Sequence, residues 1–279
     1  MTHRWSAREL LDLVLDAGSL ESWDRPIELS GHEPGYRAEL EAAATRAGTD
    51  ESVLTGRGRI RGRAVAVIVS EFGFLGGSIG RAAADRITSA VHRATAAGLP
   101  ILASTASGGT RMQEGTPAFL QMVGISRALM DHKAVGLPYL VHLRHPTTGG
   151  VYASWGSLGH LTVAEPGALV AFLGPKVYQG LHGRPFRPGV QTAENLAAVG
   201  VIDGVAAAEE LPALVERALR VLVDPPGDGA GMRRTAPRPA AGRRTAWQTV
   251  EQTRRPDRIG VRDLLAHGAS DTLQLRGTG

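Results

Sequence analysis

The chain has 279 residues, of which 43% are hydrophobic and none is cysteine, and this composition excludes global disorder, disulfides, thiolate metal sites and a cysteine nucleophile. It contains neither about 18 consecutive apolar residues nor the apolar centre of a signal peptide near its start, so we expect a soluble cytoplasmic protein with no membrane segment. The net charge of +4 comes mainly from arginines spread along the chain, without the interleaved aromatic residues of a base-stacking surface, so nucleic-acid binding is not expected.

Two helices are predicted in the first part of the chain. Residues 6–18 begin with a capping-box pair, Ser6 and Glu9, and continue with an apolar stripe at helical spacing. A second, alanine-rich helix is expected at 37–46. We interpret residues 1–50 as an N-terminal helical segment that packs on a larger domain.

Residues 51–224 alternate short apolar segments with helical patterns. Strands are predicted at 59–60, 64–70, 101–104, 139–143, 161–163, 169–173 and 202–206. Helices are predicted at 79–97, 117–133, 193–199 and 211–222, with a short helix after Gly150. Because several strands are continuously apolar, the pattern indicates an α/β fold whose sheet is covered by helices.

The composition changes after this domain. Residues 225–244 are rich in proline, glycine and arginine and are predicted to form a linker. Residues 245–279 follow as a short segment with helical character. A segment of this length is too short to build a core of its own, so we expect it to dock on another structure or remain loose.

Three glycine-rich segments each follow a predicted strand and precede a helix: 74–80, 107–111 and 147–151. Paired glycines allow a tight turn and expose backbone N–H groups. At the start of a helix these donors are unpaired and lie at the positive end of the helix dipole, which suits a phosphate or the oxyanion of an enolate. The alternative is that each pair only forms a tight strand-to-helix turn.

The first segment also matches the pattern G-x-S-x-G from Gly76 to Gly80, which in hydrolases places a serine nucleophile on a sharp turn. A hydrolase built on Ser78 would need an acid and a histidine later in the chain, and Asp203 and His267 could supply them. His267 lies beyond the linker, however, and few strands precede Ser78 to build the hydrolase sheet. The other interpretation is that Ser78 is the N-cap of the following helix.

Four arginines alternate along the first predicted hairpin: Arg57, Arg59, Arg61 and Arg63. A period of two would place all four on one face of the sheet. That face is interpreted either as a solvated surface or as a site for the phosphates of a cofactor such as coenzyme A.

Other polar residues give no recognisable pattern for chemistry. Glu71, Glu114 and Glu165 are each isolated, so no carboxylate pair is predicted. The histidines show no metal-ligand spacing. We expect His142 and His145, at the end of a strand, to serve packing and loop structure.

Taken together, the segments FGFLGGSIG, SGGTRMQEGTPAFLQM and RHPTTGGVYASWGSLGHLTVAEPGALVAFLGPKV closely resemble the β subunit of bacterial acetyl-CoA carboxylase carboxyltransferase. The resemblance runs from about Gly56 to Val223, with the motifs in the order and spacing of that family. The tail AWQTVEQTRRPDRIGVRDLLAHG resembles the beginning of the α subunit, as in the fused β–α carboxyltransferases of actinobacterial type.

The resemblance implies the crotonase (ClpP-like) fold of repeated ββα units and an enzyme component without a protein nucleophile. In that family carboxybiotin releases carbon dioxide, the biotin ureido anion removes the acyl α-proton, and the enolate attacks the carbon dioxide. The product from acetyl-CoA is malonyl-CoA for fatty acid biosynthesis. The protein therefore supplies placement and backbone hydrogen bonds, each typically contributing about 10²- to 10³-fold to the rate.

Site residues follow from the matching motifs. The resemblance implies that the N–H groups of Gly108 and Gly109 form an oxyanion hole and that Gly149 and Gly150 form the second glycine-pair turn. The residues expected to bind the substrate are Gly76, Gly77, Ser78, Ser107 and Arg111. Arg111 is also considered, with Gln113, as a residue that braces the second glycine turn.

The implied partners are those of a biotin-dependent, ATP-driven carboxylase. They are acyl-CoA, an α-type carboxyltransferase half, biotin carboxylase, and a carrier protein that bears the biotin; a homo- or hetero-oligomer is expected. The sequence departs from the family in two ways, since the N-terminal four-cysteine zinc ribbon is replaced by residues 1–50 and the α half is missing. We therefore expect no zinc and little activity without an α-type half.

Three alternatives remain open at this point. A malonyl-thioester decarboxylase subunit of the same fold would use the same enolate site without biotin. A serine hydrolase would use Ser78, and a non-catalytic scaffold would retain only the fold. The sequence does not identify the acyl group.

Overall fold

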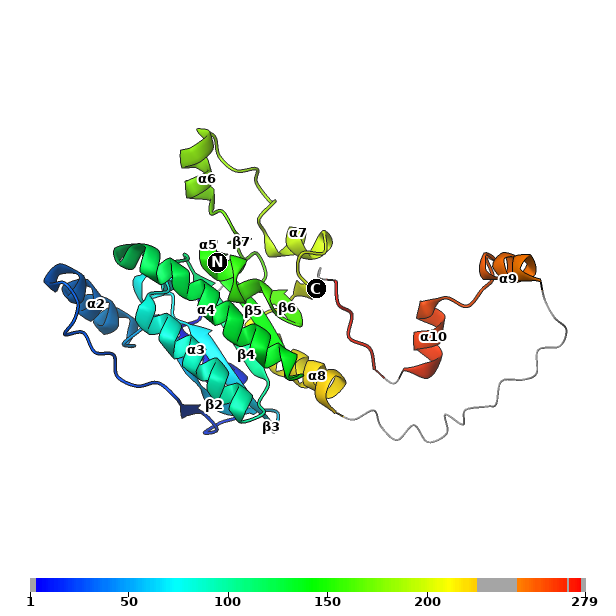
Figure 1. Cartoon of the computed structure of the whole chain (residues 1–279), viewed down its shortest axis with the longest axis horizontal. Coiled ribbons are helices and arrows are strands. Elements are labelled where there is room, and N and C mark those ends of the chain that lie inside the picture. Colours follow the sequence, from blue (N-terminus) through cyan, green and yellow to red (C-terminus); the bar gives the residue numbers. More distant parts are fainter. Residues whose placement is uncertain (1–3, 225–244, 270, 277–279) are drawn as a thin grey trace. The chain divides into compact units, whose positions relative to one another are not determined.

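A computed structural model describes residues 4–224, 245–269 and 271–276 (Figure 1). The chain divides into two compact units, one formed by Met1–Leu219 with Gln274–Gly279 and the other by Arg220–Leu273. The predicted linker, 225–244, lies outside the described residues. Residues 4–50, expected to pack as a helical segment on a larger domain, belong to the same compact unit as the sheet.

The first unit is built on one eight-stranded sheet with the order β1-β2-β3-β4-β5-β6-β8, in which β7 also pairs with β5. The strands are β1 (Glu21–Ser22), β2 (Val53–Ile60), β3 (Arg63–Ser70), β4 (Ile101–Ser107), β5 (Tyr139–Thr148), β6 (Leu161–Ala164), β7 (Val170–Ala171) and β8 (Gly204–Val205). β1, β2 and β3 are antiparallel, and from β3 onward neighbouring strands are parallel. The parallel strands are therefore joined by crossovers, and their carboxyl ends meet at one edge of the sheet.

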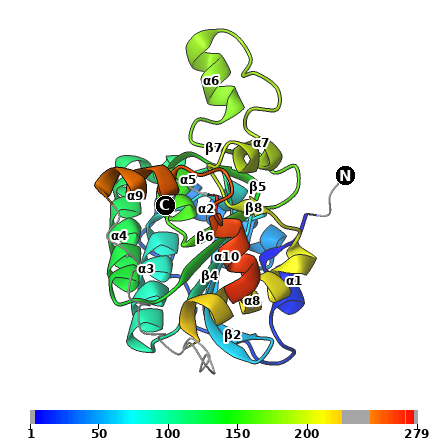
Figure 2. The same ribbon diagram turned by 90° about the vertical axis from the view of Figure 1, so that its right-hand side faces the viewer.

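The helices up to residue 224 are α1 (Ala7–Val14), α2 (Pro34–Ala47), α3 (Arg81–Ala96), α4 (Gly115–Ala134), α5 (Gly149–Ala153), α6 (Pro175–His182), α7 (Ala193–Ala198) and α8 (Leu211–Val223). Several of them cover the two faces of the sheet, whereas α6 extends away from it and buries none of its side chains (Figures 1 and 2). In Figure 2, α3 and α4 lie side by side on one face of the sheet, and α1 and α8 lie on the other. The second unit contains α9 (Ala246–Thr253) and α10 (Val261–Gly268), neither of which has a buried residue.

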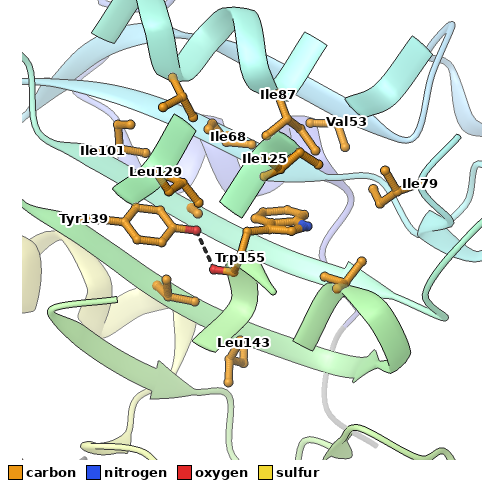
Figure 3. Packing of buried hydrophobic residues seen from close by; sticks show 14 of the residues in the cluster. Val53, Ile68, Ile79, Ile87, Ile101, Ile125, Leu129, Tyr139, Leu143 and Trp155 are labelled. Atoms are coloured by element: carbon orange, nitrogen blue, oxygen red, sulfur yellow. Dashed lines mark hydrogen bonds between the residues drawn. The ribbon is translucent and has the colours of Figure 1, made fainter. Parts of the chain in front are cut away.

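The main core lies between the sheet and the pair α3 and α4 (Figure 3). Ile68 and Ile101 project from the strands toward Ile125 of α4, and all three are at most 1% exposed. Tyr139 at the start of β5 is fully buried, and its hydroxyl donates to the carbonyl oxygen of Trp155 at 2.7 Å. A buried hydroxyl needs such a partner, so this bond fixes the turn after α5 against β5.

Most predicted elements are present with small shifts at their ends, but β2 begins at Val53, six residues before the predicted strand at 59–60, and α1 ends at Val14, four residues before its predicted end. The Ser6–Glu9 capping box is confirmed, with α1 starting at Ala7. β1 and α6 were not predicted, because β1 has only two residues and α6 buries none of its side chains. Elements this short offer too few residues for the apolar periodicity on which sequence prediction depends.

The expectation that the four arginines share one face is wrong. Arg61 lies in the hairpin turn with φ 49°. Arg59 pairs with Ala64, and Arg63 pairs with Ile60. Residues paired across antiparallel strands share a face, so Arg63 lies on the face opposite to Arg59. The two-residue turn therefore interrupts the alternation of side chains between the two faces. Arg57 forms an exposed ion pair with Glu21 at 2.7 Å.

Candidate functional site

The three glycine segments nominated from the sequence come together at the carboxyl ends of β3, β4 and β5. We call this place the glycine junction. It is formed by residues 74–80, 107–114 and 147–151, where the second segment is now taken on to Glu114, the residue before α4. The N–H of Gly108 donates to the carbonyl oxygen of Gly76 at 2.9 Å, and the Ser107 hydroxyl donates to that of Gly77 at 2.6 Å. The parallel strands therefore end in turns that are bonded directly to one another.

Two positions in these turns favour glycine, one because of close contact and both because of their backbone conformation. Gly77 has φ +64°, and a Cβ built on it would lie 2.0 Å from the carbonyl oxygen of Ala106. Gly109 has φ +113°, and a Cβ there would lie 3.5 Å from the Cα of Gly149 and 3.6 Å from the nitrogen of Gly150. Both φ values lie where side chains are disfavoured, and at Gly77 the backbone of Ala106 also leaves no room for a Cβ.

The N–H groups at the junction differ in how they are used. The Gly108 N–H is bonded to Gly76, and the Gly149 N–H donates to the carbonyl oxygen of Phe172 at 3.0 Å. The Gly109 N–H donates to the Ser107 hydroxyl oxygen at 3.0 Å. Gly150 lies in the first turn of α5, where an N–H has no acceptor within the helix. The four predicted glycines thus share one site, but Gly108 and Gly149 use their N–H groups to hold the turns together.

Of the two roles considered for Arg111, the geometry supports bracing. The side chain is 1% exposed. Its guanidinium forms an ion pair with both carboxylate oxygens of Glu51, and its Nη2 also donates to the carbonyl oxygen of Ser78 at 2.7 Å. Because these contacts connect the second glycine segment to the first, Arg111 stabilises the junction as a buried side chain.

The interpretation of Ser78 as a helix N-cap is wrong. α3 begins at Arg81 with Gly80 as its N-cap, and the capping acceptor is the Glu114 carboxylate, which receives the Arg81 N–H at 2.7 Å. A Cβ on Gly80 would lie 2.2 Å from Glu114 Oε1, so glycine leaves room for this carboxylate. The positive end of α3 is therefore capped by a residue from the second glycine segment.

The surroundings of Ser78 do not resemble those of an activated nucleophile. Its hydroxyl oxygen lies 3.4 Å from Nε of Arg111. An arginine stays protonated and cannot accept a proton, so it does not act as a general base. Asp203, the acid of the hydrolase interpretation, accepts the N–H of Thr162 at 2.8 Å. His267 belongs to the second unit.

The histidines near the sheet are structural, as predicted. His142 is fully buried, its Nδ1 lies 3.1 Å from the Ser104 hydroxyl, and burial lowers its pKa to about 3. His145 accepts the N–H of Leu169 at Nδ1, at 3.1 Å. Both imidazoles are therefore neutral at neutral pH.

Sequence reasoning missed three residues of the supporting shell: Tyr36, Glu51 and Glu114. Glu114 follows Arg111 by three positions, and their side chains approach to 3.7 Å. That i, i+3 spacing was a signal that could have found it. Tyr36 and Glu51 lie 75 and 60 positions from Arg111, and no local pattern connects them to it.

Neither a membrane span nor a metal site is found in the part of the chain that the structure describes. None of the described helices is both long and apolar enough to cross a bilayer. Likewise, the described residues contain no group of three or more histidine, aspartate or glutamate side chains placed to hold a metal ion.

Residues 4–224 match the carboxyl transferase domain family. The chain is 58% identical over 275 residues to a probable biotin-dependent acyl-coenzyme A carboxylase β3 subunit of Mycobacterium tuberculosis, covering 99% of this chain and 55% of that protein. It is 40% identical over 214 residues to the acetyl-coenzyme A carboxylase carboxyl transferase subunit β of Maricaulis maris, covering 77% and 68%. The chain thus spans about half the length of the mycobacterial relatives that it matches.

Solved structures show the same fold at lower identity. Transcarboxylase 12S aligns with a TM-score of 0.64 and 24% identity over 78% of this chain and 41% of that one. A chain of the Pseudomonas malonate decarboxylase MdcD–MdcE hetero-dimer aligns with a TM-score of 0.60 and 22% identity over 76% and 84%. The predicted crotonase-type α/β fold is confirmed. With the family match covering most of its residues, the chain belongs to the carboxyl transferase domain family.

Proposed function

We propose that this chain is the β-type carboxyltransferase half of a biotin-dependent acyl-CoA carboxylase. The observation that carries the proposal is the glycine junction, in which backbone from three strand ends converges without a free acid or base. Membership of the carboxyl transferase family supports the same reaction. The substrate would be an acyl-CoA thioester, acetyl-CoA being the simplest, and the product malonyl-CoA would feed fatty acid synthesis.

Gly109 and Gly150 are the donors best placed to hold the thioester oxygen as it becomes an enolate. The Gly109 N–H is bonded only to a hydroxyl oxygen, which is a weaker acceptor than an enolate oxygen. The Gly150 N–H needs no rearrangement, since it lies in the first turn of α5. Gly108 and Gly149 position these two donors through their own bonds to Gly76 and Phe172.

The remaining residues fit a reaction in which the base arrives with the other substrate. Arg111 and Glu51 are paired with each other, and His142 is buried and neutral. Biotin, carried on a separate protein, would supply the carboxyl group and the base. The chain's own part is to hold the enolate oxygen while the α-carbon bonds to the transferred carbon and the thioester carbonyl re-forms.

Partner binding is supported by the outer face of α4, where exposed apolar side chains lie beside the charged Arg127 and Asp131. Met112, just before α4, is 87% exposed, and four apolar side chains on the helix are more than half exposed: Phe119, Leu120, Val123 and Met130. An exposed apolar patch of this kind commonly marks an interaction surface. We propose that this face contacts an α-type half or a second copy, in an oligomer that biotin carboxylase and the biotin carrier protein serve.

Location and metal content are part of the same proposal. A carboxylase of this class would work in the cytoplasm, close to its acyl-CoA pool. It would bind no zinc, because residues 1–50 contain no cysteine, and the described part, 4–50, forms two helices with a short strand between them.

One alternative is favoured by a specific observation. The malonate decarboxylase chain aligns over 84% of its length, so a malonyl-thioester decarboxylase has the size and fold of this unit. Such an enzyme would not need biotin, and biotin dependence of turnover therefore separates the two. A serine hydrolase is not supported by the contacts of Ser78, and a fluorophosphonate probe that labelled Ser78 would contradict this.

The test of the proposed donors compares Gly150→Pro with Gly150→Ala in the chain reconstituted with an α-type subunit. Proline removes the N–H at a first-turn position, where its ring is tolerated, whereas alanine keeps the donor. The added Cβ lies 3.2 Å from Thr110 Oγ1 in both variants, so crowding at Cβ is matched. Gly109 is less suitable, because its φ of +113° does not admit proline.

The expected result is malonyl-CoA decarboxylation with free biotin about 100-fold slower in Gly150→Pro than in Gly150→Ala. Binding of coenzyme A, measured by calorimetry, should change far less. Equal turnover in the two folded variants would overturn the assignment of Gly150.

A further inference from the structure

One side chain of the N-terminal helix α2 reaches the glycine junction from outside. The hydroxyl of Tyr36 donates to Oε1 of Glu114 at 2.6 Å and accepts from Nη1 of Arg111 at 3.4 Å. Burial and the hydrogen bond to Glu114 raise the pKa of Tyr36, so the phenol remains a donor throughout the working pH range of an enzyme. α2 is therefore joined to two charged residues of the second glycine segment.

Those two residues connect separate parts of the junction. Through its other oxygen Glu114 caps α3, and its ion pair with Arg111 spans 3.7 Å. Arg111 in turn holds the carbonyl oxygen of Ser78 in the first glycine segment. A shift of Glu114 would consequently move the start of α3 and the first and second glycine segments relative to one another.

α2 is also fixed against the first glycine segment by apolar contacts. Leu40 and Ala43 on its inner face pack with Phe74, and all three are at most 4% exposed. The guanidinium of Arg111 lies over the Phe74 ring, 5.3 Å from its centroid. α2 thus contacts both segments, through Phe74 in one and through Glu114 and Arg111 in the other.

We infer that Tyr36 is a positioning residue for the glycine junction. Its hydroxyl holds Glu114 between Arg81 and Arg111, and so keeps the Gly109 donor in register with the first segment. The N-terminal helical segment is then part of the active-site support and not only a covering of the sheet. The inference rests on the proposed function for its catalytic consequence, but its structural consequence is independent of it.

The test uses Tyr36→Phe, which removes one hydroxyl and keeps the ring. The matched control is Glu39→Ala, which removes the other hydrogen bond from α2 to the same loop, the one from Gln113 Nε2 at 2.9 Å. That bond is exposed and does not reach the Glu114 carboxylate. Glu114→Gln and the double variant Tyr36→Phe/Glu114→Gln complete a double-mutant cycle.

In the full chain with an α-type subunit, kcat for malonyl-CoA decarboxylation should fall about tenfold in Tyr36→Phe, while KM stays within about twofold. Glu39→Ala should remain within about twofold in both. Adding Tyr36→Phe to Glu114→Gln should cause no further loss, because the tyrosine acts through that carboxylate. A merely structural tyrosine would lower the melting temperature and leave kcat unchanged where the variants are folded, and this result would overturn the inference.

Amide hydrogen exchange separates this inference from the proposed function. Tyr36→Phe should speed exchange at Arg81, Gly108 and Arg111, whose N–H groups are bonded across the junction, and Glu39→Ala should not. Unchanged exchange in Tyr36→Phe, or equal acceleration in both variants, would refute the positioning role. Absence of any turnover by the unmodified complex would refute the proposed function alone.

Discussion

Replacing Gly77 by alanine tests whether the close contact between the first two glycine segments is required. The new Cβ would lie 2.0 Å from the carbonyl oxygen of Ala106, whereas real Cβ contacts are essentially never shorter than about 3.0 Å. The two turns must therefore move apart by about 1 Å. Gly98→Ala is the matched control, since Gly98 has the same φ of +64° and no heavy atom within 4 Å of its Cβ position.

The magnitudes follow from these two environments. Both variants carry the cost of a left-handed alanine, about 1–2 kcal/mol of unfolding free energy. Gly77→Ala adds an overpacking cost of about 1–3 kcal/mol, and a displacement of about 1 Å at the site should lower turnover about 100-fold. Urea unfolding and malonyl-CoA decarboxylation measure the two effects. If Gly77→Ala matched Gly98→Ala in both assays, the turns would not be in the tight contact described.

Three further predictions concern charge, pH and metal. Glu51→Gln leaves Arg111 buried without its main partner, and we expect it to lower the free energy of unfolding by about 3 kcal/mol, measured with urea. Glu21→Gln breaks an exposed ion pair and should cost less than about 1 kcal/mol. Equal costs would show that the Arg111 pair is not buried. Because burial lowers the pKa of His142 to about 3, the unfolded chain binds a proton there that the folded chain does not. This histidine should thus reduce stability by about 1.4 kcal/mol per pH unit as the pH falls below about 6.5, and His142→Gln should flatten that slope; an unchanged slope would refute the assignment. The purified protein should contain less than about 0.1 zinc per chain and keep its melting temperature in chelator, whereas near-stoichiometric zinc in elemental analysis would reveal a missed site.

Local sequence patterns predicted the parts of the fold that depend on near neighbours. The Ser6–Glu9 capping box and the apolar strands depend on residues within a few positions of one another, and these predictions are confirmed. The prediction for the hairpin arginines was wrong because the two-residue turn, Arg61 and Gly62, places Arg63 on the face of the sheet opposite to Arg59. α6 was missed because none of its side chains is buried.

The candidate site could be predicted only in part, for the same physical reason. Glycine pairs marked the turns, but their meeting depends on the pairing of β3, β4 and β5, which the sequence does not state. The bonds of the supporting shell, such as Tyr36 to Glu114, join residues 78 positions apart. The hydrogen bond from the Gly108 N–H to the carbonyl oxygen of Gly76 is a tertiary contact and likewise has no local sequence pattern.

The central claim is that this chain supplies the acyl-CoA half of a biotin-dependent carboxyltransferase. It is tested most directly by malonyl-CoA decarboxylation with free biotin, measured on the 279-residue chain alone and with an added α-type subunit, with light scattering to report assembly. We predict negligible turnover by the chain alone and biotin-dependent turnover when the two associate. Full activity from a strict monomer, or turnover that does not depend on biotin, would contradict the claim.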